Sequence, residues 1–234
     1  MFIKSNRRLT RRVSFNLIWL LVLLAATAPA ALADELAIWN FNDSDLTVDH
    51  GGGTLVTNLN AANILFASGT TTNARLGDAA GQSLSLQGGS STANNGRQIT
   101  FNVSTLGFSN IIVSFATQGT STGFNSNQFQ YSLDGTTFVN FAAPYTPASA
   151  FGSVPLVFSL AAIAELADNP NAAFRIVFNG ATSSTGTNRI DNFVVEGTPL
   201  TTSVPEPTSA VLLLTSLSGL YRVRKRRRAA KTQP

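Results

Sequence analysis

The sequence contains no cysteine, and this absence removes several kinds of chemistry at once. Disulfide bonds, thiolate metal sites and cysteine nucleophiles are excluded. The one histidine, His50, is too few for a histidine zinc site, and within "VDHGGG" we expect it in a solvent-exposed turn. A serine hydrolase needs an acid, a base and a nucleophile held together, and one solvent-exposed histidine does not indicate such a group.

Carboxylates are also scarce, with twelve acidic residues in 234. Glycosidases need only two of them, so composition alone leaves a secreted hydrolase open. Most of these acids fall in turns or at strand ends, however. We therefore expect a noncatalytic protein without a cofactor, apart from a structural calcium ion considered below.

Positive charge is almost missing from the middle of the chain. Between residues 34 and 208 there are four arginines, no lysine and all twelve acidic residues, which leaves a net charge of −8. Binding to nucleic acid requires a basic face that displaces counterions from phosphates. The middle of the chain offers none, so a nucleic-acid partner is excluded there. The basic residues gather instead at the two ends.

Residues 1–33 have the layout of a secretory signal peptide. Five positive charges lie in residues 1–12, the apolar segment "FNLIWLLVLLAATAPA" follows, and "ALA" ends at Ala33. This order predicts export and cleavage after Ala33. An uncleaved anchor helix is the alternative reading.

The chain ends with an apolar segment followed by a basic cluster. Residues 208–221 would form about 21 Å of helix, against about 30 Å of hydrocarbon in a bilayer. Basic side chains that follow can extend such a short span by snorkelling. They should also stay on the cytoplasmic side, which places the preceding domain outside. The cluster consists of Arg222, Arg224, Lys225, Arg226, Arg227 and Arg228.

The segment "VPEPTS", the apolar helix and the terminal basic cluster together resemble the PEP-CTERM sorting signal of Gram-negative bacteria. The resemblance covers residues 203–228, and the tail "AAKTQP" is longer than the family pattern. It implies that an exosortase, a membrane-embedded cysteine transpeptidase or protease, recognises Val204, Pro205, Glu206 and Pro207. It also implies anchoring in the inner membrane before processing, then a cell-surface or extracellular location among extracellular polysaccharide and biofilm. A plain C-terminal anchor is the alternative.

The chain thus divides into a signal peptide (1–33), a domain (34–200) and a sorting segment (201–234). In the domain, short alternating stretches such as "RQITFNVS" and "AAFRIVFNG" lie between Gly-, Asn-, Ser- and Thr-rich turns. "QFQYSLDGTTFVNF" predicts a hairpin that turns at Asp134-Gly135. Eight or nine such strands predict an all-β antiparallel β-sandwich, for which we favour a jelly-roll order. "SLAAIAELADNP" predicts one short helix.

Two ligands remain open for this domain. Calcium takes carboxylate, amide and carbonyl oxygens, and Asn42, Asp43 and Asp191 are candidates, although Asx residues also shape turns. Extracellular polysaccharide would need exposed aromatic side chains, while the sole tryptophan of the domain, Trp39, is expected in the core. The aromatic candidates are Phe124, Tyr131, Tyr145 and Phe151. Three polar loops, at 88–96, 117–127 and 180–187, could gather at one end of the sandwich.

Overall fold

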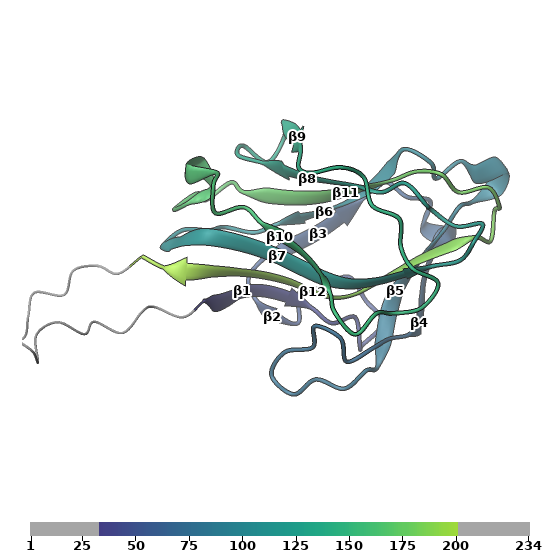
Figure 1. The fold of residues 1–234 in the computed structure, drawn as a ribbon, viewed down its shortest axis with the longest axis horizontal. Coiled ribbons are helices and arrows are strands. Elements are labelled where there is room, and N and C mark those ends of the chain that lie inside the picture. The colour runs from purple at the N-terminus through teal and green to yellow at the C-terminus, as the bar shows by residue number, and fades with distance from the viewer. Residues whose placement is uncertain (1–32, 201–234) are drawn as a thin grey trace, which may run out of the picture. The chain divides into compact units, whose positions relative to one another are not determined.

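The alternating segments form strands, and in a computed structural model that describes residues 33–200 these strands make two antiparallel sheets (Figure 1). Side chains that point between the sheets are apolar, and those that point outward are mostly polar. The pattern is what a sandwich requires, because successive side chains of a strand point to opposite faces. The predicted all-β class and the two-sheet antiparallel architecture are confirmed.

Sheet A has seven strands and sheet B has five. Sheet A consists of β10 (Leu156–Ser159), β7 (Phe108–Gly119), β12 (Thr187–Pro199), β1 (Asp34–Trp39) and β2 (His50–Gly51) in spatial order, with β5 (Gln82–Gln87) beside β12 and β4 (Ile64–Ser68) beside β5. Sheet B consists of β3 (Thr54–Thr57), β6 (Arg97–Asn102), β11 (Ala173–Phe178), β8 (Gln128–Ser132) and β9 (Phe138–Asn140). Three 3₁₀ turns are η1 (Ala61–Asn63), η2 (Ser90–Thr92) and η3 (Ala164–Leu166).

Strand β12 organises sheet A. It pairs with β7 along one side, and along the other with β5 at its start and β1 at its end. Asp34 is the register partner of Gly197, so the first and last strands of the domain reach the same end of sheet A. Eight of the eleven connections between consecutive strands pass from one sheet to the other, and only β1–β2, β4–β5 and β8–β9 stay within a sheet. The jelly-roll order stays a prediction.

Aromatic rings fill the space between the sheets. The ring of Phe193 on β12 stacks on that of Phe101 on β6, with centroids 3.5 Å apart, and Trp39 meets both rings edge-on. The three side chains are fully buried, which confirms the expected position of Trp39. Among the described residues, the buried core runs from Leu36 to Ala181 and includes Ile190, Phe193 and Val195 on β12. A core of this extent is typical of a domain that folds by itself.

The predicted short helix is wrong. "SLAAIAELADNP" contains only the 3₁₀ turn η3. Contacts with distant parts of the chain override its helical pattern, since the Leu160 N–H donates to the Ile111 carbonyl at 2.9 Å and the Thr105 hydroxyl donates to the Leu166 carbonyl at 2.6 Å. Asp168 then takes a left-handed conformation, with φ of 53°.

Helices of membrane-spanning length are not found within residues 33–200. The expected signal helix and the expected C-terminal transmembrane helix lie outside the described residues.

Candidate binding face of sheet B

Eight of the thirteen residues on the outward side of sheet B have amide or hydroxyl side chains. Its strands turn Ile99, Phe101 and Phe174 into the core, so the alternate residues face away from it. We call this outward side the amide face. Arg175 is the one charged residue of this face. The face consists of Thr54, Val56, Gln98, Thr100, Asn102, Ala173, Arg175, Val177, Gln128, Gln130, Ser132, Phe138 and Asn140.

A hydrogen-bonded row crosses three neighbouring strands at the centre of the amide face. The Nε of Arg175 on β11 donates to the Oε1 of Gln130 on β8 at 2.6 Å. The Nε2 of Gln130 donates in turn to the Oδ1 of Asn140 on β9 at 2.7 Å. The guanidinium carbon of Arg175 also lies 3.6 Å from the ring centroid of Phe138, a cation–π contact. These side chains are half-buried or exposed, so the row is accessible to a ligand.

The polarity of this row is set by Arg175. A guanidinium can only donate, so the amide oxygen of Gln130 must accept and its NH₂ group must donate onward. The Oδ1 of Asn140 accepts that bond, which leaves the NH₂ group of Asn140 directed elsewhere. Within residues 33–200, neither that NH₂ group nor the two terminal nitrogens of Arg175 make a hydrogen bond. The row therefore offers N–H donors to a ligand.

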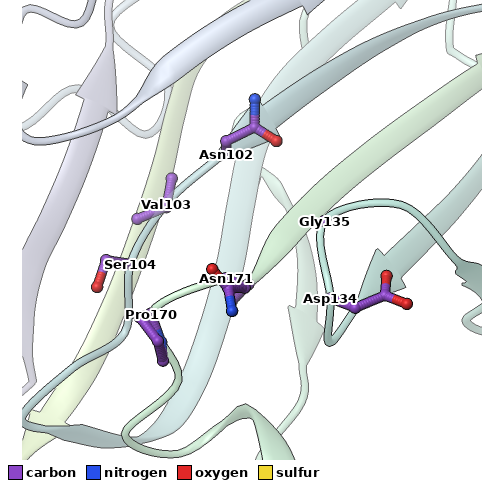
Figure 2. Close-up of a pocket in the computed structure, with 8 residues that line it drawn as sticks. Asn102, Val103, Ser104, Asp134, Gly135, Pro170 and Asn171 are labelled. Atoms are coloured by element: carbon purple, nitrogen blue, oxygen red, sulfur yellow. The ribbon is translucent and has the colours of Figure 1, made fainter.

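A pocket of about 240 Å³ adjoins the amide face at the end of β6. Asn102 belongs to both, and its amide donates to the Thr54 hydroxyl at 3.1 Å. Figure 2 shows Asn102, at the end of β6, and Ser104, just after it, on one side and the turn at Asp134-Gly135 on the other. The lining residues are Asn102, Val103, Ser104, Asp134, Gly135, Pro170, Asn171 and Ala172.

Asp134 is the only carboxylate in the lining of this pocket, and its hydrogen bonds stabilise the turn in which it lies. Its Oδ1 accepts hydrogen bonds from the backbone N–H groups of Thr137 and Thr136, at 2.6 and 2.7 Å. These bonds hold the pKa of Asp134 well below its ordinary value, so the group is ionised near neutral pH. In Figure 2 the carboxylate points away from Asn171. The pocket can thus bind hydroxyl groups through amides and Ser104, but its lining lacks the carboxylate pair of a glycosidase.

The aromatic candidates from the sequence do not form a binding platform. Phe124 is buried in the core with 1% exposure, and Tyr131 packs against the core from the inner side of β8. Tyr145 also packs there, and its buried hydroxyl makes no hydrogen bond within the described residues. Phe151 lies half-buried in the loop before β10. Phe138, which the sequence did not single out, is the aromatic residue on the amide face.

The calcium candidates near the start of the domain have hydrogen-bond partners within the protein. The Oδ1 of Asn42 accepts from the distant Gln82 N–H at 2.9 Å, and the Oδ1 of Asp43 accepts from the Asp45 N–H at 3.3 Å. Only the second bond is of the kind by which Asx side chains shape turns. Within residues 33–200 no three acidic or histidine side chains are grouped as metal ligands. A calcium site stays a prediction.

The third candidate, Asp191, is fully buried where residues 69–81 cross the outer side of sheet A. Its Oδ2 accepts from the Thr70 N–H at 2.6 Å and its Oδ1 from the Asn192 N–H at 2.9 Å. The amide of Asn192 donates back to the Thr70 and Thr72 carbonyls, at 2.7 and 2.9 Å. Burial raises the pKa of Asp191 to about 7. We call residues 69–81 the strap.

Arg75 fastens the middle of the strap. Glu35 and Glu196 are register partners on β1 and β12, and like charges placed opposite each other destabilise a sheet. Arg75 lies 3.6 Å from a Glu35 oxygen and 3.4 Å from a Glu196 oxygen. One guanidinium therefore relieves the repulsion and attaches the strap at the same time.

The three polar loops gather at the end of the sandwich away from Asp34 and Pro199 (Figure 1). The Gly88 N–H donates to the Gly186 carbonyl at 3.0 Å, and the Thr182 N–H to the Thr122 carbonyl at 3.0 Å. Asn95 both donates to and accepts from Ala181, at 3.0 and 2.9 Å. Gathering at one end is as expected, but these bonds show that the loops mainly support one another.

The remaining predicted residues lie elsewhere. His50 lies on the short edge strand β2 and not in the predicted turn. Its Nε2 is 3.8 Å from Asp78 and 42% of its side chain is accessible, as expected of a solvated residue. The sorting motif, Val204 to Pro207, and the basic cluster from Arg222 to Arg228 lie outside the described residues.

No protein-family model matches this chain, and no curated protein does. Several solved structures have a similar fold at low identity. The structure of TmCBM61 with β-1,4-galactotriose is 10% identical with a TM-score of 0.42, over 72% of this chain and 98% of that one. The CBM22-1 xylan-binding domain of Paenibacillus barcinonensis Xyn10C is 12% identical with a TM-score of 0.42, over 75% and 100%. Domain 4 of AbnA, an extracellular arabinanase of Geobacillus stearothermophilus, with arabinotriose is 14% identical with a TM-score of 0.43, over 72% and 95%.

Proposed function

We propose that residues 34–200 form a noncatalytic polysaccharide-binding domain of an exported protein, and that the amide face is its binding surface. The observation that carries the proposal is the row from Arg175 through Gln130 to Asn140. These side chains are accessible on one side of the sheet and are held in position by hydrogen bonds to one another. A sugar presents hydroxyl oxygens along an extended chain. Oriented donors on neighbouring strands suit such a ligand, because little ordering remains for binding to impose.

The surroundings of the row fit the same ligand. Gln98, Asn102 and Gln128 add amides on either side, and the aromatic ring of Phe138 lies against Arg175. Five strands spaced about 4.8 Å apart make the face roughly 20 Å wide, enough for several sugar units rather than one. The adjoining pocket could receive a substituent or a chain end.

Gln130→Ala is expected to weaken polysaccharide binding at least tenfold. Gln130 holds both Arg175 and Asn140, so its loss frees two ligand-binding groups and removes two hydrogen bonds. Isothermal titration against the best ligand of a glycan array measures the change. Gln118→Ala, on β7 of the other sheet, is the matched control and should bind as the wild type does. Equal affinity of both variants would remove the amide face from consideration.

We further propose that the exported chain is anchored in the membrane by residues 208–221 and processed at its Pro-Glu-Pro segment by an exosortase. The support is the order of the signal peptide, the motif from Val204 to Pro207, the apolar segment and the basic cluster. Processing would release or transfer the domain to the cell surface or the extracellular matrix.

Intact-mass measurement of the extracellular protein tests this processing. The mature form should begin near Asp34 and lack residues 208–234. Glu206→Ala should leave the protein uncut in the membrane fraction, whereas Thr202→Ala, outside the motif, should be processed normally. An extracellular wild-type form that retains residues 208–234 would contradict the proposal.

A further inference from the structure

Arg175 stands out against the charge of the rest of the domain. Residues 34–200 contain four arginines, no lysine and eleven acidic residues, a net charge of −7. Such a domain repels polyanions at long range. Arg75 is neutralised by two glutamates, whereas within residues 33–200 Arg97, Arg175 and Arg189 have no carboxylate at ion-pairing distance. Of these three, Arg175 lies on the amide face. The amide face therefore carries one uncompensated positive charge on an anionic protein.

The contacts of Arg175 hold this charge in a defined orientation. Its Nε donates to Gln130, and its guanidinium group lies over the ring of Phe138. The two terminal nitrogens make no hydrogen bond within the described residues, and they form the edge of a guanidinium that binds an oxyanion through two parallel hydrogen bonds. Burial lowers the pKa of Arg175, but an arginine remains charged at any physiological pH.

The neighbouring groups favour the same type of ligand. The free NH₂ group of Asn140 is also a donor, whereas the Oε1 of Gln130 is already engaged by Arg175. A neutral sugar hydroxyl can accept a hydrogen bond from these donors, but an ionised acceptor forms a stronger, charge-assisted bond with a guanidinium. A carboxylate or a sulfate only accepts, so it matches the row fully.

We infer that the ligand of the amide face is an anionic polysaccharide whose carboxylate or sulfate groups bind the free edge of Arg175 and the NH₂ group of Asn140. This inference rests on the proposed function and narrows it to a substrate class. The inference also means that the polymer is bound by contacts at Arg175 and not by long-range attraction, since the net negative charge of the domain repels an anionic polymer.

The test compares polymers that differ in charge but share a backbone. The domain of residues 34–200 is used, because the basic tail would itself attract polyanions. Affinity electrophoresis at about 0.15 M salt is run with polygalacturonate and its methyl ester, and with dextran sulfate and dextran. Binding of one charged polymer at least tenfold tighter than its neutral partner supports the inference and identifies the anion as carboxylate or sulfate.

Two arginine variants distinguish binding at Arg175 from an effect of the overall charge of the domain. Arg175→Gln should lose that preference for the charged polymer. Arg97→Gln removes the same charge from an exposed residue at the start of β6, and this variant should retain the preference for the charged polymer. Circular dichroism and the unfolding midpoint check that both variants fold. Arg175→Lys is a further variant that retains the charge but loses the two-pronged contact. It should bind the charged polymer at least fivefold more weakly than the wild type does.

The outcomes distinguish the two proposals. Equal or tighter binding of the neutral partners, or an unchanged preference in Arg175→Gln, overturns the anionic ligand and leaves polysaccharide binding standing. Failure of the wild-type domain to bind any glycan of a broad array overturns both.

Discussion

Replacing Phe193 with alanine is expected to lower the free energy of unfolding of the domain by about 4 kcal/mol. Phe193 lies on the central strand of sheet A and is fully buried. Its ring stacks on Phe101 of sheet B at 3.5 Å and on Phe115 of β7 at 5.5 Å, and Trp39 meets it edge-on at 6.1 Å. Removing it opens a cavity among rings held by two different sheets, which cannot close together without breaking strand pairing.

Denaturant unfolding of the domain of residues 34–200 measures this loss as a lower midpoint at unchanged slope. Val157→Ala on β10 is the control, because that side chain is 56% exposed and its truncation should cost less than about 0.5 kcal/mol. A loss below about 1 kcal/mol for Phe193→Ala would mean that these rings do not join the two sheets.

Much of the core could be predicted from alternation alone. Leu84 and Leu86 on β5 face the core, as do Phe174, Ile176 and Phe178 on β11. These strands are half-buried, so the period of two is present in the sequence itself. Short edge strands such as β2 and β10 escaped prediction because they bury few side chains and leave little pattern.

The binding face was harder to predict because it depends on the register of one hairpin. A two-residue turn at Asp134-Gly135 would pair Tyr131 with Phe138 and point both rings into the core. In the structure Tyr131 pairs with Val139, one residue further along. A shift of one residue moves every side chain of a strand to the other side of the sheet, and so Phe138 joins Arg175 on the outside.

The surroundings of Asp191 could not be predicted from the sequence either. Its partner Thr70 lies 121 residues away, and the strap that carries Thr70 has no regular strand or helix. Only the folded sheet brings the two together. Asp191 was selected from the sequence as a calcium candidate. Its burial beneath the strap, which no sequence pattern indicated, raises the pKa of this carboxylate.

Stability should fall between pH 5 and pH 8, and Asp191 should account for about 3 kcal/mol of the fall. Its pKa is raised by burial to about 7, against an ordinary value of 3.8. Between these values the folded protein holds a proton that the unfolded chain has released, so the free energy of unfolding decreases as pH rises. The contribution is complete below the unfolded value and is lost as pH rises through about 7.

Asp191→Asn isolates this contribution, because an amide does not titrate. The free energy of unfolding of this variant, measured in urea at pH 5 and pH 8, should change by about 3 kcal/mol less than that of the wild type, whatever the absolute stability of the variant. Equal pH dependence in both proteins would mean that Asp191 titrates normally. Repeating the pH 8 measurement with calcium and with a chelator also tests the metal prediction, since an ion bound at Asp191 would stabilise the wild type and not Asp191→Asn. The two results are linked: a cation beside this carboxylate would favour its charged form and remove the decrease in stability towards pH 8.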